Sequence, residues 1–247
     1  SPKWLRDAAI SPDGTTVAFT YKGDIFTVPV KGGTATQITS NQDYDGVPVW
    51  SKDGKNIVFL STREGSDDIF ITSAKGGTPR RLTTSSGNEK PLTFLNDSIL
   101  LFSASSLPGR TTARAPFSTQ VYELNVNRNN PRPKLYLSQP MISADANSSG
   151  QVLYQDRKGV EDVLRKHERS SGTADVWLYN NGLFSQLTHQ NWGNQCPVWG
   201  KGDTYYFVSE KDGTLNVFEG NIVNKTEKQL TKFTKHPVRS WSSSDNG

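Results

Sequence analysis

The sequence predicts an all-β protein, a β-propeller made of four-stranded antiparallel blades. Three marks recur along the 247 residues in one order: an Asx/Gly turn, a polar residue followed by a β-branched and an aromatic residue, and a Leu-Thr or Ile-Thr pair. The first two copies of the second mark, Asp24-Ile25-Phe26 and Asp68-Ile69-Phe70, begin 44 residues apart. A period of about 40–45 residues is typical of one WD-like propeller blade. The marks therefore predict a propeller.

We predict five complete blades and the first strand of a sixth, all within a single domain of residues 1–247. The blades cover approximately residues 6–39, 46–83, 90–138, 141–188 and 195–231, and the partial sixth covers 236–247. Hydrophobic residues make up 33% of the chain and aromatic residues 10%. This aromatic content is higher than that of a disordered segment. A core shared by many short elements is therefore expected.

Each blade is expected to open with an inner strand that ends in an aromatic residue, as in Val47-Pro48-Val49-Trp50. The aromatic returns ten or eleven residues after the Thr of the preceding blade, at Trp50, Phe94, Trp199 and Trp241. Such a fixed distance favours packing between blades over a ligand platform. Cys196 falls at the inner-strand position of Val47 and is interpreted as a small apolar filler.

The second strand follows the Asx/Gly turn and is a nearly continuous apolar run, as in residues 56–60. Continuous hydrophobicity indicates that both faces of the strand are buried. The third strand begins at the polar residue of the second mark, where Asp24, Asp68, Gln120, Asp175 and Asn216 recur. A short acceptor there can bind backbone N–H groups. Arg63 follows the second strand, and we expect it to pair with a carboxylate such as Asp68.

Two long connections join second and third strands. Eighteen residues separate Phe102 from Gln120, and 21 separate Tyr154 from Asp175. In an up-and-down blade these insertions leave the end at which one blade connects to the next, which is often the binding face. Residues 160–169 have helical spacing of their apolar positions and predict one short helix. The insertions contribute Arg110, Arg114, Arg165 and His167, which predict a site for acidic groups such as a peptide carboxylate. A solvated pair of loops is the alternative.

Composition and motifs argue against several functions. The net charge is +4 without a basic stripe, so nucleic-acid binding is not expected. No apolar run approaches 18 residues, so a soluble chain without membrane insertion is expected. The single cysteine allows neither an internal disulfide nor a cysteine zinc site. Only three histidines are present, and no Gly-x-Ser-x-Gly or nucleotide-binding motif occurs. We therefore expect no catalytic residues, no metal and no cofactor.

The repeats resemble the Asp-Gly propeller repeats of TolB and of tricorn-type peptidases. More specifically, they are similar to the amino-terminal six-bladed propeller of bacterial tricorn-like serine peptidases. The segments that carry this resemblance are residues 2–14, 21–33, 86–94, 154–179 and 235–241. It covers essentially the whole chain, and residues 154–179 are its most specific part.

The resemblance implies a non-catalytic module that controls peptide passage to or from a catalytic core outside this chain. Its expected partners are peptides and the other domains of the parent enzyme, and its expected location is the periplasm or another exported site. The alternatives are a free-standing TolB-like interaction propeller of the cell envelope and a propeller enzyme. Because a sixth blade would be incomplete, the chain is expected either to self-associate through the open ring or to depend on further residues after Gly247.

Overall fold

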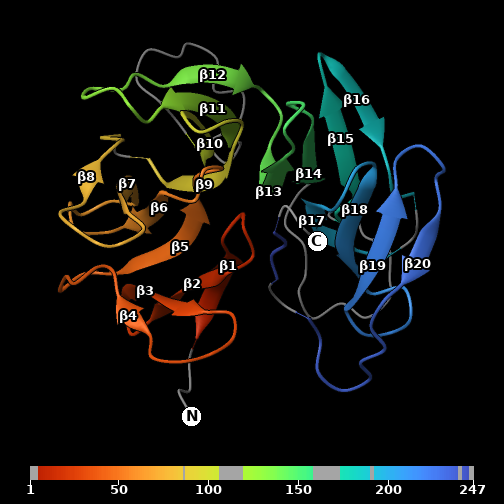
Figure 1. Cartoon of the computed structure of the whole chain (residues 1–247). Helices are drawn as coiled ribbons and strands as arrows, with labels where there is room; N and C mark the ends of the chain where they lie inside the picture. Colours follow the sequence, from red (N-terminus) through yellow and green to blue (C-terminus); the bar gives the residue numbers. More distant parts are fainter. Residues whose placement is uncertain are drawn as a thin grey trace. The chain divides into compact units, whose positions relative to one another are not determined.

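The computed structural model describes residues 5–85, 87–105, 119–157, 173–189, 192–238 and 241–244 (Figure 1). Regular structure in these ranges consists of twenty β-strands and no helix. The strands form five antiparallel sheets of four strands each, and sequential strands are neighbours in every sheet. The prediction of an all-β propeller with five four-stranded blades is therefore confirmed.

Three blades belong to a first compact unit, which comprises Ser1–Pro140 and Ser242–Asn246. In chain order their strands are β1 (Arg6–Ile10), β2 (Thr16–Tyr21), β3 (Asp24–Pro29), β4 (Thr36–Gln37), β5 (Asp45–Trp50), β6 (Asn56–Ser61), β7 (Asp68–Ser73), β8 (Arg80–Arg81), β9 (Glu89–Phe94), β10 (Ile99–Ala104), β11 (Gln120–Asn125) and β12 (Lys134–Leu137). Strand β5 lies against β1, β2 and β3, and β9 lies against β5, β6 and β7. Strands β5 and β9 thus each pack on the blade that precedes them.

The other two blades belong to a second unit, which comprises Met141–Trp241 and Gly247. Their strands are β13 (Met141–Ala146), β14 (Val152–Asp156), β15 (Val176–Asn180), β16 (Leu183–Gln186), β17 (Asn194–Trp199), β18 (Thr204–Ser209), β19 (Asn216–Asn221) and β20 (Glu227–Gln229). Strand β17 lies against β13, β14 and β15, which repeats the packing of the first unit.

The core of each unit lies between blades, as the apolar second strands require. Ile57, Val58 and Phe59 of β6 are fully buried. Phe94, at the end of β9, joins a cluster that includes Val58 of the preceding blade. Trp199, at the end of β17, joins a corresponding cluster with residues of β14 and β15. The expected packing of these aromatic residues between blades is confirmed.

The Asx/Gly turns are closed by their own side chains. The Ser11 hydroxyl donates to Asp13 Oδ1 (2.5 Å), and the same oxygen accepts from the Thr15 amide (3.0 Å). Gly14 lies in the left-handed region (φ +72°), which glycine adopts without a steric penalty. The next blade repeats this arrangement at Ser51 and Asp53. The recurrence of the first mark is therefore a requirement of turn geometry.

Inner strands carry a recurrent bulge near their midpoint. Asp7, Val47 and Cys196 have φ values of +52°, +54° and +51°. The pairing register shifts at each of these positions, as a β-bulge requires. Cys196 is half-buried, and its amide donates to Gln155 Oε1 (3.1 Å). Cys196 thus shares a backbone conformation with Val47 as well as a position in the repeat.

The prediction that residues 236–247 include the first strand of a sixth blade is wrong. The described part of 236–247, residues 236–238 and 241–244, contains no strand. A strand is held by the ladder hydrogen bonds of a neighbour, and this segment is held by other contacts. The Val238 amide donates to the Leu215 carbonyl (2.9 Å), and the Trp241 indole donates to the Cys196 carbonyl (3.0 Å). The helix predicted over 160–169 lies outside the described residues.

Candidate functional site

The two predicted insertions leave one defined end of their blades, called here the insertion end. At this end the first strand of a blade begins, the second ends and the third begins. The insertion of the third blade leaves after Ala104 and returns at Gln120. That of the fourth blade leaves after Asp156 and returns at Val176. The site residues predicted on these insertions, Arg110, Arg114, Arg165 and His167, lie outside the described residues.

A threonine clamp explains why the second and third sequence marks recur together. The Thr that follows the fourth strand accepts a hydrogen bond from the second residue of the polar-β-branched-aromatic mark. These bonds run from the Ile25 amide to Thr39, from Ile69 to Thr83, from Val176 to Thr188 and from Val217 to Thr231, at 2.9–3.0 Å. The hydroxyl thus holds the last part of the blade against its third strand.

The polar residue that opens each mark is also a hydrogen-bond acceptor, as predicted. Asp24 Oδ1 accepts from the Asn41 amide (3.2 Å), and Asn216 Oδ1 accepts from the Phe233 amide (2.7 Å). Asp175 accepts from the Thr188 hydroxyl (3.1 Å). Since an amide serves as well as a carboxylate, the position is structural in these blades.

Two arginines bind buried carboxylates at the insertion end of the second blade. Arg63 Nη2 donates to both oxygens of Asp45 (2.8 and 2.9 Å), and its guanidinium lies 4.6 Å from the centroid of the Phe70 ring. Asp45 is fully buried. The partner expected for Arg63, Asp68, instead accepts from Arg81 (2.8 Å). Spacing after the second strand therefore predicted the pairing of Arg63 but not the correct carboxylate.

Glu89 is the exceptional residue of this end. It begins β9, is 2% exposed, and neither of its carboxylate oxygens has a hydrogen-bond partner within the described residues. Burial raises the pKa of Glu89 to about 7, and the charge of Asp68 adds to this rise, while Thr83 and the charge of Arg81 oppose it. Burial also raises the pKa of Asp68, against the opposing charge of Arg81. Glu89 is therefore a buried carboxyl group whose pKa lies near neutral pH.

Sequence reasoning missed Glu89, although a signal for it exists. A polar residue precedes the inner-strand aromatic by five positions at Asp45, Glu89 and Asn194, and all three are buried. The Asp45 carboxylate is bonded to Arg63, whereas Arg81, whose charge acts on Glu89, is bonded to Asp68 instead. The repeat thus marks the position, and only the packing shows which copy is left without a bonded arginine.

At the insertion end of the fourth blade, the buried carboxylates have hydrogen-bond partners. Asp156 accepts from the Asp175 amide (2.8 Å) and from the Trp177 indole (3.0 Å). Gln186 donates to Asp175 (3.0 Å). These buried carboxylates have partners that account for them as parts of the fold.

Within the described part of the chain, no cluster of three His, Cys, Asp or Glu side chains could hold a metal ion. His189 and His236 are exposed, and neither makes a hydrogen bond to another described residue. The described residues also contain no helix that is long and apolar enough to cross a membrane.

Comparison with known proteins identifies the family of this chain. The sequence model of the family described as "Tricorn protease N-terminal beta propeller domain" matches residues 2–247. The chain belongs to this family. The matched residues, 2–247, therefore form a propeller domain and contain no peptidase domain. The resemblance had implied six blades, whereas the structure contains five four-stranded blades in its described residues.

Relatives and solved structures agree with this assignment. Tricorn protease homolog 1 of Streptomyces coelicolor is 27% identical over 218 residues, which are 87% of this chain and 19% of the relative. The tricorn protease of Thermoplasma acidophilum is 21% identical over 247 residues, which are 95% of this chain and 22% of the relative. This chain thus spans about a fifth of the length of these curated relatives.

Two structural matches show the fold. A crystal structure of the tricorn protease matches with a TM-score of 0.79 and 20% identity, covering 98% of this chain and 24% of that one. A putative TolB from Agrobacterium tumefaciens matches with a TM-score of 0.71 and 14% identity, covering 94% and 82%.

Proposed function

We propose that this chain is the propeller module of a tricorn-like serine peptidase and controls the passage of peptides to or from a catalytic core. That core would lie in other parts of the same polypeptide. One observation carries the proposal: the family match extends over 2–247, while the relatives named as tricorn proteases are several times longer than this chain. The other domains of the parent enzyme are then the natural partners of the module.

The test compares residues 1–247 with the longest product of the gene that encodes them. We expect the longer product to hydrolyse unstructured peptides and to lose this activity with a serine-directed reagent. Residues 1–247 alone should give no hydrolysis above background. Hydrolysis by residues 1–247 that disappears on His167→Ala would overturn the non-catalytic role.

The alternative is a free-standing TolB-like interaction propeller of the cell envelope. It is supported by the fold match to a putative TolB, most of which this chain covers. A longest gene product without a peptidase core and without hydrolytic activity would favour this alternative.

We propose further that the insertions bind acidic groups of peptides through Arg110, Arg114, Arg165 and His167. Arginine suits bidentate contacts to carboxylates, which supports their assignment. Calorimetry with peptides that carry or lack acidic groups tests this, with Arg110→Gln and Arg114→Gln as variants. Equal binding of both kinds of peptide would remove the assignment.

Two further proposals rest on the resemblance and on the predicted repeat count. Export to the periplasm is tested by fractionation of producing cells. Self-association of the chain is tested by sedimentation at increasing concentration, and a monomer at the highest concentration would contradict it.

A further inference from the structure

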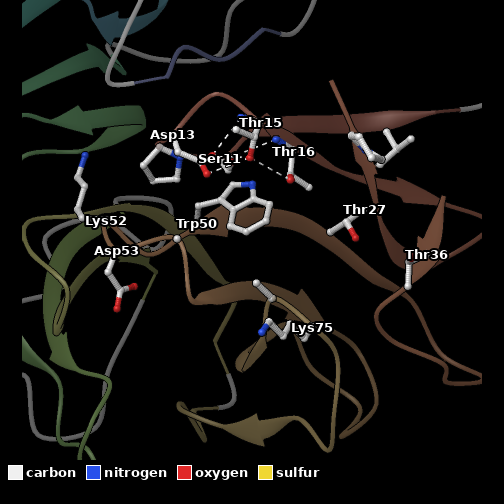
Figure 2. Close-up of a pocket in the computed structure, with 15 residues that line it drawn as sticks. Ser11, Asp13, Thr15, Thr16, Thr27, Thr36, Trp50, Lys52, Asp53 and Lys75 are labelled. Atoms are coloured by element: carbon white, nitrogen blue, oxygen red, sulfur yellow. Dashed lines mark hydrogen bonds between the residues drawn. The ribbon is translucent and has the colours of Figure 1, made fainter. Parts of the chain in front are cut away.

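A pocket of about 660 Å³ lies between the first and second blades of the first unit, at the end opposite the insertion end. Figure 2 shows its lining, with Trp50 beside the turn of residues 11–16. The lining comes from the two Asx/Gly turns, from β3 and β4, and from the turn after β7. It is therefore built from parts of the repeat that recur in both blades.

The two acidic residues of the lining are already committed to their own turns. Asp13 accepts from Ser11 and Thr15, and Asp53 accepts from Ser51 and from the Lys55 amide. The Ser11 hydroxyl lowers the pKa of Asp13, and the Ser51 hydroxyl lowers that of Asp53. Both carboxylates thus serve as turn anchors, and their hydrogen bonds are satisfied locally.

Lys75 supplies a cation that is not committed in this way. Its backbone amide donates to the Ser73 hydroxyl (3.1 Å), which fixes the turn after β7. Its ammonium forms no ion pair with any carboxylate of the described residues. An anionic group in the pocket would therefore meet Lys75 without displacing an existing partner.

Trp50 gives the pocket an apolar wall, and its one polar group already has a hydrogen-bond partner. Its indole N–H donates to the Ala9 carbonyl (2.9 Å), so the ring is fixed on the first blade. Val28 and Pro29 of β3 also line the pocket. A ring held in place loses little conformational freedom when a ligand packs on it.

Thr27 and Thr36 add hydroxyl groups to a lining that also contains Lys52. They face each other across the β3–β4 pair, and neither hydroxyl makes a hydrogen bond within the described part of the chain. A hydroxyl can donate and accept, so the pair can serve both the N–H and the C=O of a peptide unit.

We propose that this pocket binds the C-terminal residue of a peptide that ends in an apolar side chain. Its carboxylate pairs with Lys75, its side chain packs on Trp50, and its last peptide unit bonds to Thr27 and Thr36. The proposal deepens the proposed function, because it names the peptide group that a second site, away from the insertions, recognises.

The experiment is calorimetric titration of residues 1–247 with acetyl-Gly-Gly-Leu as the free acid and as the C-terminal amide. We expect the free acid to bind roughly tenfold more tightly, the ratio typical of one charge-assisted hydrogen bond. Lys75→Gln should reduce the affinity for the acid to that for the amide.

Lys31→Gln is the matched control. Lys31 occupies the equivalent Lys-Gly-Gly turn of the first blade, is exposed like Lys75, and does not line the pocket. It should keep the preference for the acid. Thr27→Val should weaken binding of acid and amide alike, and its thermal melting curve shows whether it folds.

Any of these results would overturn the proposal: equal affinity for acid and amide, a preference that survives Lys75→Gln, or a preference lost in Lys31→Gln. Competition by inorganic phosphate equal to that by the peptide acid would also overturn it, because the site would then be a general anion site. None of these results depends on whether a peptidase core accompanies the chain, so failure here is separable from failure of the proposed function.

Discussion

The hydroxyl of Thr83 accepts a 2.9 Å hydrogen bond from the backbone amide of Ile69, and both residues are buried in one blade. We expect Thr83→Val to lower the free energy of unfolding by about 1–3 kcal/mol, because it leaves a buried amide without its acceptor. Chemical denaturation measures this loss. Thr84→Val, at the exposed neighbouring residue, should change stability by less than about 0.5 kcal/mol. Equal effects in the two variants would show that the clamp contributes nothing.

The ion pair of Arg63 and Asp45 predicts strong coupling between the two residues. Arg63→Met should cost about 3 kcal/mol or more, because Asp45 is fully buried and would keep its charge without a partner. Asp45→Asn in the same chain should recover part of this loss, since it removes the unpaired charge. A double-mutant cycle from denaturation curves measures the coupling, and additive effects would contradict a direct pair.

Glu89 predicts a loss of stability as the pH rises. Its pKa in the folded chain is about 7, against an ordinary value of 4.5, so the folded state binds more protons than the unfolded state between these values. The free energy of unfolding should therefore fall from about pH 4.5 to pH 7 and level off above it, by about 3 kcal/mol in total.

Glu89→Gln is the variant that isolates this effect, because the amide has nearly the same shape and no charge. The free energy of unfolding of Glu89→Gln minus that of the unsubstituted chain should be larger at pH 8 than at pH 5. Glu64→Gln, at an exposed residue of the same region, serves as the control. Parallel curves for Glu89→Gln and the unsubstituted chain between pH 5 and 8 would rule out a buried proton at Glu89.

Trp199 predicts a large packing contribution in the second unit. It is 6% exposed and contacts apolar residues of the preceding blade. Trp199→Ala should destabilise by about 3–5 kcal/mol, the usual effect of emptying a large aromatic site. Leu183→Ala, at a residue that is 73% exposed, should have little effect. Similar denaturation midpoints for the two variants would show that Trp199 is not part of the core.

The repeat was predictable from sequence because its marks are local chemistry. An Asp two residues after a Ser, followed by Gly, closes its own turn, as at Ser11 and Ser51. The Leu-Thr or Ile-Thr pair lies only 12 to 14 residues after the strand residue that its Thr clamps. Neither mark requires knowledge of distant contacts, so five copies could be aligned without a structure.

The features that sequence did not predict depend on distant partners. Arg63 has several carboxylates within a few residues, yet it binds Asp45, which precedes it by 18 positions on the neighbouring strand. Glu89 is unusual because Arg81 bonds to Asp68 and not to Glu89. The expected strand near Trp241 had the right residues but no neighbouring ladder. Spacing predicts which residues share a place in the repeat, and packing decides which partner each of them meets.

The threonine clamp has a consequence for how such chains can change in length. Each clamp joins two strands of one repeat, and each turn is closed by side chains of that same repeat. A gene segment that encodes one blade therefore carries its own internal hydrogen bonds when it is duplicated or deleted. Only the contacts with the flanking blades must be remade, and the apolar contacts among them tolerate exchange at similar volume. The clamp thus makes a single blade a unit that recombination can add or remove.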